Sequence, residues 1–210
     1  RVPRAGLVLG RDRHGEPVAV RLAGPEPVRA VLAGGVRAGA LLAVRALALG
    51  TQLVVQSSRP EVWEALLRGV SLPGDTVRLV PAGQPVALAP ASPLVPQLVV
   101  LDTGDPDATA EPAAWRTTLV VRDGVAATDL DALARADLVI LQPLSAAEAA
   151  LAGRALHLGG SQDWLTMIRA DMVGVVSRGV VRWLRLSATP IETQVIGAPE
   201  RPVPETVVSG

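Results

Sequence analysis

The stretch VRAVLAGGVRAGALLAVRALALGTQLVVQSSRP, from Val28 to Pro60, decides the fold. It reads as an apolar strand at Val28–Ala33, a glycine turn, an apolar helix over about Val36–Leu49 and, after Gly50, a second strand at Gln52–Gln56. A helix that connects two strands of this kind is a βαβ crossover, which makes the strands parallel. This stretch therefore predicts an α/β fold built on a largely parallel sheet.

The rest of the chain adds strands to both sides of this unit. Further apolar runs place the strands of the parallel sheet near Val28, Gln52, Leu98, Thr118 and Leu138. A hairpin over residues 6–22 and a hairpin with a last strand over residues 171–197 add antiparallel strands. We expect a three-layer α/β sandwich of the Rossmann or P-loop kind. It forms one domain over residues 1–197, with its core at 28–160 and a flexible tail at 198–210.

Composition excludes several kinds of function. Twenty basic and twenty acidic residues cancel, which argues against a nucleic-acid partner, because such a partner requires a basic face. The absence of cysteine excludes disulfides, thiolate nucleophiles and zinc–thiolate sites. No apolar run reaches the roughly 20 residues that span a bilayer. The chain begins with Arg1, so we expect a fragment of a longer protein, with any membrane anchor outside it.

The glycine turn has the spacing of a phosphate-binding loop. Gly34 and Gly39 match the two glycines of the pattern G-x-x-x-x-G-K-[ST], with Gly35 beside the first. Ala40 stands in place of the lysine, and Leu41 in place of the hydroxyl that binds Mg²⁺. We expect the glycines to serve a tight turn and close helix–sheet packing, and Leu41 to point into the core.

The strand that ends at Asp102 resembles a Walker B strand. The sequence LVVLD is followed by Thr103, where ATPases of this kind carry a catalytic glutamate. Phosphoryl transfer depends on the missing lysine, hydroxyl and glutamate. The sequence therefore predicts no catalytic residues, no bound cofactor and no ATP hydrolysis, so that the chain is not an enzyme. Residual nucleotide binding at the glycine turn is the alternative.

Three carboxylates at the end of the same strand raise a metal-site hypothesis. Asp102, Asp105 and Asp107 lie where a parallel sheet presents its ligands, and such a group can hold Mg²⁺ in nucleotide-sugar enzymes. Their spacing fits no calcium loop, and the surrounding Gly, Pro and Ala residues are typical of a solvated loop. We therefore predict no metal site and keep a metal-dependent nucleotide-sugar enzyme as a further alternative.

Several segments carry a family resemblance. In order, LVLGRDRHGEPVAVRL, VRAVLAGG-VRAG, TQLVVQSSRPEVWEAL and QLVVLDTG resemble a degenerate RecA-like ATPase domain of the FtsK/SpoIIIE and VirD4 coupling proteins. The stretch from Gly6 to about Leu79 also resembles the soluble region of EccE, a component of the type VII (ESX) secretion complex of actinobacteria. The matching pieces are Gly6–Gly10, Pro17-Val18, Arg45–Gly50 and Trp63–Leu66.

The EccE resemblance implies a non-catalytic scaffold subunit of the secretion complex. Its soluble domain would lie on the cytoplasmic face of the bacterial cell membrane, beside subunits of the EccB, EccC and EccD kinds. The codons of the absent Lys, Asn, Phe and Tyr are AT-rich, and this GC-rich signature fits an actinobacterium. The other resemblance implies a degenerate or atypical P-loop NTPase domain of an FtsK/VirD4-like translocase.

Overall fold

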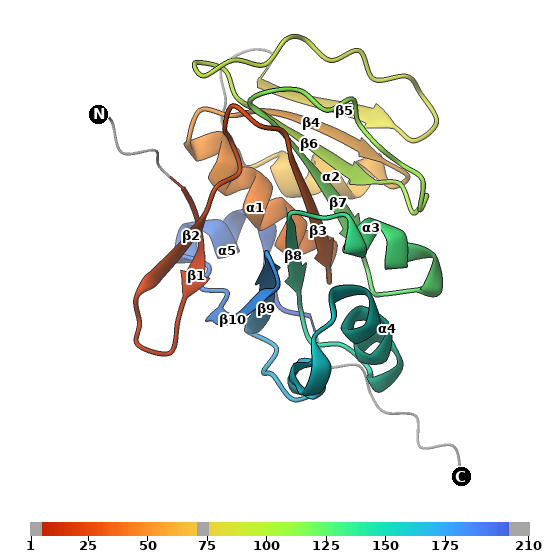
Figure 1. Ribbon diagram of the computed structural model, residues 1–210. Helices are drawn as coiled ribbons and strands as arrows, with labels where there is room; N and C mark the ends of the chain where they lie inside the picture. The colour runs from red at the N-terminus through yellow and green to blue at the C-terminus, as the bar shows by residue number, and fades with distance from the viewer. Residues whose placement is uncertain (1–5, 71–75, 202–210) are drawn as a thin grey trace.

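Ten strands form one mixed sheet in the computed structural model, which describes residues 6–70 and 76–201 (Figure 1). The order across the sheet is β2-β1-β10-β9-β8-β3-β7-β6-β4-β5. The parallel strands are β3 (Val28–Ala33), β4 (Gln52–Ser57), β5 (Val77–Pro81), β6 (Gln97–Asp102), β7 (Arg116–Arg122) and β8 (Leu138–Leu141). The antiparallel strands are β1 (Leu7–Arg11), β2 (Pro17–Val20), β9 (Met172–Ser177) and β10 (Val180–Arg185).

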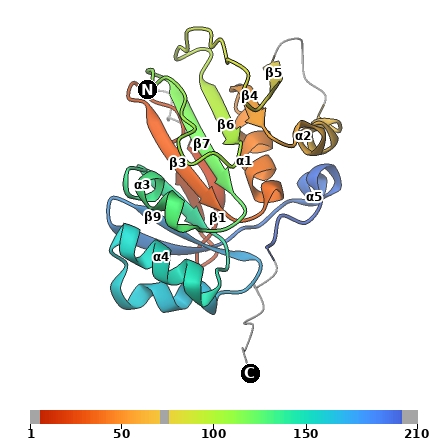
Figure 2. The same ribbon diagram turned by 90° about the vertical axis from the view of Figure 1, so that its right-hand side faces the viewer.

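Helices cover both faces of the sheet (Figures 1 and 2). One face carries α1 (Val36–Ala48), α2 (Pro60–Leu67) and α5 (Pro190–Ile196). The other carries α3 (Leu130–Ala134), α4 (Ala146–Leu156) and two 3-10 helices, η2 (Ala127–Asp129) and η3 (Gly159–Thr166). The predicted three-layer α/β fold with a mainly parallel sheet is therefore confirmed.

The central strands are mostly apolar because both of their faces are buried. Successive side chains of a strand point to opposite faces. In β3, Leu32 accordingly packs in the core beneath α1, and Val31 packs in the core beneath α3 and α4. Both side chains are at most 1% exposed. The continuous apolar runs in the sequence thus reflect a sheet covered on two sides.

The antiparallel strands join the two ends of the chain into the same sheet. The β1–β2 and β9–β10 hairpins form as predicted, and β1 pairs with β10. The last strand predicted within residues 171–197, at Thr193–Ile196, is wrong, since these residues belong to α5. Thr189 Oγ1 accepts a hydrogen bond from the Glu192 backbone N–H, and Pro190 takes the first helical position. This capping box begins a helix despite the β-branched residues that follow.

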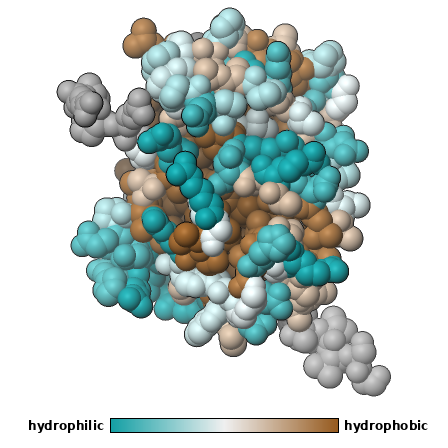
Figure 3. Space-filling view, viewed as in Figure 1, coloured by the Kyte–Doolittle hydropathy of each residue, from teal (hydrophilic) through white to brown (hydrophobic). Residues whose placement is uncertain are grey.

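The β2 edge of the sheet is protected from pairing with another chain. Figure 3, in the view of Figure 1, shows apolar surface in the middle of the molecule and a hydrophilic β1–β2 tip at the lower left. That tip contains Arg11, Asp12, Arg13 and Glu16, and Pro17 opens β2. Charged residues and proline at an edge disfavour the addition of a further strand.

The predicted flexible tail is ordered over its first four residues. The carbonyl oxygen of Pro199 accepts a hydrogen bond from Gln142, and Arg201 pairs with Glu148. The rest of the predicted tail, residues 202–210, lies outside the described residues. In residues 6–70 and 76–201, no helix is both long and apolar enough to cross a membrane.

Candidate nucleotide site

The glycine turn lies at the carboxyl edge of the parallel strands, where open α/β sheets bind their ligands. It joins the end of β3 to the start of α1, with β7 and β8 on either side of β3. The Gly34 N–H donates to the carbonyl oxygen of Arg122 at the end of β7, at 2.7 Å. Gly35 is the N-cap of α1. Because glycine has no side chain, the N-cap residue makes no side-chain hydrogen bond to the helix.

The side chain of Gln142 fills the space in front of this turn. Gln142 directly follows β8 and is 0% exposed. Its Oε1 accepts a hydrogen bond from the Gly35 N–H at 2.7 Å, and its Nε2 donates to the carbonyl oxygen of Pro199 at 2.8 Å. The carboxamide oxygen therefore binds a backbone N–H that an anion would bind in a phosphate-binding loop.

Two glycines of the turn have close neighbours. A Cβ on Gly34 would lie 2.2 Å from Gln142 Oε1, so the Gln142 side chain would have to shift. A Cβ on Gly39 would lie 3.1 Å from a methyl group of Val121, because α1 packs closely on β7. Neither glycine has a positive φ angle. Close approach of the neighbouring groups, and not backbone conformation, therefore explains glycine at both positions.

The two replaced positions of the motif lie in the core. Ala40 and Leu41 are both 0% exposed and belong to the core between α1 and the sheet. The lysine and hydroxyl of a phosphate-binding loop would face the phosphates. The side chains that stand here face the core beneath α1. Arg37 is the exposed cation of the turn, and it lies against Gly197, where a Cβ would be 3.4 Å from its guanidinium carbon.

Asp102 ends β6 and is bound by the chain's own donors. It is 4% exposed and accepts hydrogen bonds from Ser57 Oγ at 2.9 Å and from Trp63 Nε1 at 2.8 Å. Arg59 binds both of its oxygens, with Nε at 2.9 Å and Nη2 at 2.8 Å. Hydrogen bonds to Asp102, which contribute most, and to Asp123 raise the pKa of Arg59. This permanent cation neutralises the carboxylate that a Walker B strand offers to Mg²⁺.

A segment near the end of the described chain lies across the glycine turn. We call residues 197–201 the C-terminal strap. Its Pro199 is buried and bonded to Gln142, and its Arg201 donates to the carbonyl oxygen of Pro143 at 2.8 Å. Arg201 also pairs with Glu148 at 3.0 Å. The same carboxylate accepts a bond from the Ser145 N–H at the start of α4. The strap thus links the turn to α4.

Acidification should weaken this attachment. Burial favours the neutral form of Glu148, but hydrogen bonds from Arg201 and Ser145 outweigh it and hold the pKa of Glu148 below its ordinary value of 4.5. A depressed pKa contributes stability that is fully present above the unfolded value and is lost as pH falls below it. We expect the urea midpoint to fall less steeply between about pH 5 and about pH 3 in Glu148→Gln than in the wild type. Parallel curves would show that the pair contributes nothing.

The acidic loop does not assemble into a metal site. Asp105 and Asp107 are exposed, and Asp105 Oδ1 accepts a bond from the Asp107 N–H. Asp102 is held by Arg59 and its neighbours, as described above. In the part of the chain that the structure describes, no group of three or more His, Cys, Asp or Glu residues is placed to hold a metal ion.

The sequence interpretation missed the residues that close the site. Arg59, Gln142 and Arg201 were not singled out, although Gln142 directly follows a buried strand beside the glycine turn. A polar residue at the carboxyl end of a neighbouring parallel strand is the signal that was available. Arg201 offered no such signal, because it comes from the predicted tail.

Three solved structures are similar to this chain in fold. VirB4 of Thermoanaerobacter pseudethanolicus is similar with a TM-score of 0.62 and 10% identity, over 90% of this chain and 98% of that one. The cytoplasmic domain of the type VII secretion ATPase EccC of Thermomonospora curvata gives 0.61 and 12%, over 96% of this chain and 32% of that one. The genome packaging NTPase B204 of Sulfolobus turreted icosahedral virus 2, in complex with AMPPCP, gives 0.50 and 9%, over 77% and 98%.

These similarities confirm the resemblance to P-loop ATPases at the level of the fold. The chain corresponds to about a third of the EccC chain, whose matched share is 32%. No family model and no curated protein matches the sequence. The prediction that the chain is not an enzyme is wrong, because the fold it shares is the fold of NTPases.

Proposed function

We propose that this chain is an atypical P-loop NTPase domain of the FtsK/VirD4 kind that works in a protein-secretion complex, with nucleotide access controlled by Gln142. The observation that carries the proposal is the hydrogen bond from the Gly35 N–H to Gln142 Oε1, at 2.7 Å. It supports the proposal because the glycine turn lies at the sheet edge where a phosphate-binding loop would lie, and the chain's own amide accepts its N–H. The similarity to VirB4 and EccC supports the setting in secretion.

Displacement of the Gln142 side chain would open a site whose positive electrostatic potential suits an anion. The start of α1 carries the partial positive charge of the helix dipole, and the Gly35 N–H would then be available to an anion. Arg37 is exposed in the turn and makes no ion pair within the described residues. In this arrangement Arg37 supplies the basic group that the missing lysine supplies in other phosphate-binding loops.

Replacing Gln142 by alanine tests the proposal. We expect Gln142→Ala to bind Mg-ATP at least about tenfold more tightly than the wild type in calorimetric titrations. A tenfold change in the dissociation constant corresponds to about 1.4 kcal/mol of binding free energy. Adding Arg37→Gln to this variant should reverse the gain. Equal dissociation constants for wild type and Gln142→Ala would contradict the proposal. Thermal melts establish that the variants fold, and a chain that ends after Ile196 offers a second way to release the amide.

The partners and the location belong to the same proposal. The domain would act on the cytoplasmic face of the bacterial cell membrane, beside EccB-, EccC- and EccD-like subunits of a type VII complex. The similarity to the EccC cytoplasmic domain and the EccE-like segments over residues 6–79 support this setting. Purification of the full-length protein from its own cells tests it. Co-purification of secretion subunits is expected, and their absence would contradict the placement.

A further inference from the structure

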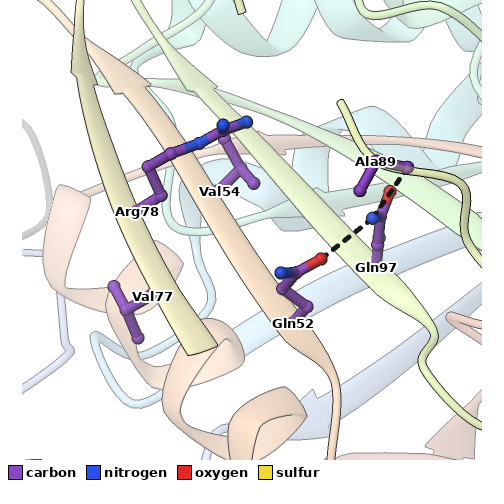
Figure 4. A pocket seen from close by; sticks show the side chains of 6 residues that line it. All are labelled: Gln52, Val54, Val77, Arg78, Ala89 and Gln97. Atoms are coloured by element: carbon purple, nitrogen blue, oxygen red, sulfur yellow. Dashed lines mark hydrogen bonds between the residues drawn. The ribbon is translucent and has the colours of Figure 1, made fainter. Parts of the chain in front are cut away.

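A partly polar pocket lies at the edge of the sheet opposite to the glycine turn. It occupies about 240 Å³ above the first halves of β4, β5 and β6. Its lining residues are Gln52, Val54, Val77, Arg78, Ala89 and Gln97 (Figure 4). Gln52 and Gln97 are the first residues of their strands, so the pocket opens at the amino edge of the parallel sheet. It is separate from the candidate nucleotide site at the carboxyl edge.

The amides of the pocket form a connected network. Gln97 Nε2 donates to Gln52 Oε1 at 2.9 Å and to the carbonyl oxygen of Ala89 at 3.0 Å. In Figure 4 the Arg78 side chain reaches from β5 across to Val54. Arg78 is exposed and donates one hydrogen bond, to the carbonyl oxygen of Ala87. A guanidinium has five N–H donors, so Arg78 keeps donors for a ligand in the pocket.

A buried positive charge lies directly behind the pocket. Arg116 is 5% exposed and donates to Gln97 Oε1 at 3.0 Å, to the Ala89 carbonyl at 3.0 Å and to the Glu111 carbonyl at 2.7 Å. All three acceptors are neutral. A buried cation is costly unless an anion compensates it.

Most other shielded arginines of the described chain have an anionic partner, although Arg29, half-buried on β3, forms no ion pair with a described residue. Ion pairs neutralise Arg45, Arg59, Arg122 and Arg201. Within residues 6–70 and 76–201, no ion pair includes Arg78 or Arg116. None of the six lining residues is acidic. The two cations therefore create a positive potential at the pocket, to which the buried Arg116 contributes with little screening by solvent.

We propose that this pocket binds an oxyanion group, a carboxylate or a phosphate, of a small ligand. Arg78 is its direct ligand, because a guanidinium donates two parallel hydrogen bonds to such a group. Arg116 acts from behind Gln97, which it holds in place, and contributes charge without contact. The occupant would supply the negative charge that the six lining residues do not provide.

Anion titrations of the folded chain test the proposal. Sodium phosphate and sodium acetate are added separately at constant ionic strength, and binding is followed by calorimetry and by the melting temperature. We expect saturable binding of at least one anion, and a loss of at least about tenfold in affinity in Arg78→Gln. Binding of phosphate alone identifies a phosphate group, and binding of both identifies a general oxyanion site. Arg182→Gln, which changes an exposed arginine on β10, should bind as the wild type does.

Three results would overturn the proposal. The first is no saturable binding of either anion, and the second is equal binding by Arg78→Gln and the wild type. The third concerns Asp75, which precedes Arg78 by three positions in the sequence. If phosphate binds only after Asp75→Asn, the chain's own carboxylate neutralises Arg78 and the pocket serves no external ligand. Melting curves establish that each variant is folded.

Discussion

Replacing Asp102 by alanine is expected to lower the free energy of unfolding by about 3–5 kcal/mol. The carboxylate accepts hydrogen bonds from Ser57, Arg59 and Trp63. Its removal leaves the indole N–H of Trp63, which is 0% exposed, without an acceptor, and takes one of two anions from Arg59. Urea denaturation measures the change.

A matched variant separates the buried contacts from simple charge removal. Asp123 also pairs with Arg59, at 2.8 Å, but its side chain is 67% exposed. An ion pair at the surface is worth about 0–1 kcal/mol. Asp123→Ala should therefore cost less than about 1 kcal/mol. If both variants lost the same stability, the hydrogen bonds to Ser57 and Trp63 would be energetically unimportant.

Replacing Leu41 by serine is expected to cost about 2–4 kcal/mol. Leu41 is 0% exposed in the core beneath α1, so serine creates a cavity and buries a hydroxyl. The same change restores the hydroxyl of the phosphate-binding pattern, at a position that faces the core. Urea melts of Leu41→Ser measure the loss.

A leucine-to-serine substitution at the end of α1 provides the control. Leu49 is the C-cap of α1 and is 48% exposed. Leu49→Ser should therefore change stability by less than about 0.5 kcal/mol. An unchanged midpoint for Leu41→Ser would mean that the side chain lies in an open site.

The candidate nucleotide site carries internal substitutes for its ligands. Gln142 Oε1 binds the Gly35 N–H, where a phosphate oxygen would bind, and Arg59 binds Asp102, where a metal ion would bind. Both contacts keep buried polar groups at this edge satisfied. The C-terminal strap adds to this through the Pro199 carbonyl. Opening of the turn therefore requires new partners for Gly35 and Gln142 together.

The sequence by itself determined the parallel core of the fold. Apolar runs such as Ala30–Ala33 and Leu98–Leu101 are required where a strand is covered on both faces, so the local sequence pattern agrees with the buried environment. The glycine turn was also readable, because its position between strand and helix follows from local spacing. The last helix was misread, because Thr193–Ile196 contains β-branched residues, whereas the capping box that begins it lies upstream at Thr189.

Only the tertiary structure decided how the candidate site is closed. Gln142 reaches Gly35 across 107 positions of sequence, and Arg201 reaches Glu148 across 53. The Arg59–Asp102 pair spans 43 positions. Strand order brings these groups to one edge, and no local pattern encodes which neighbour each polar group will meet. A buried donor requires an acceptor, but many residues of the chain can supply one, so the choice depends on the folded arrangement.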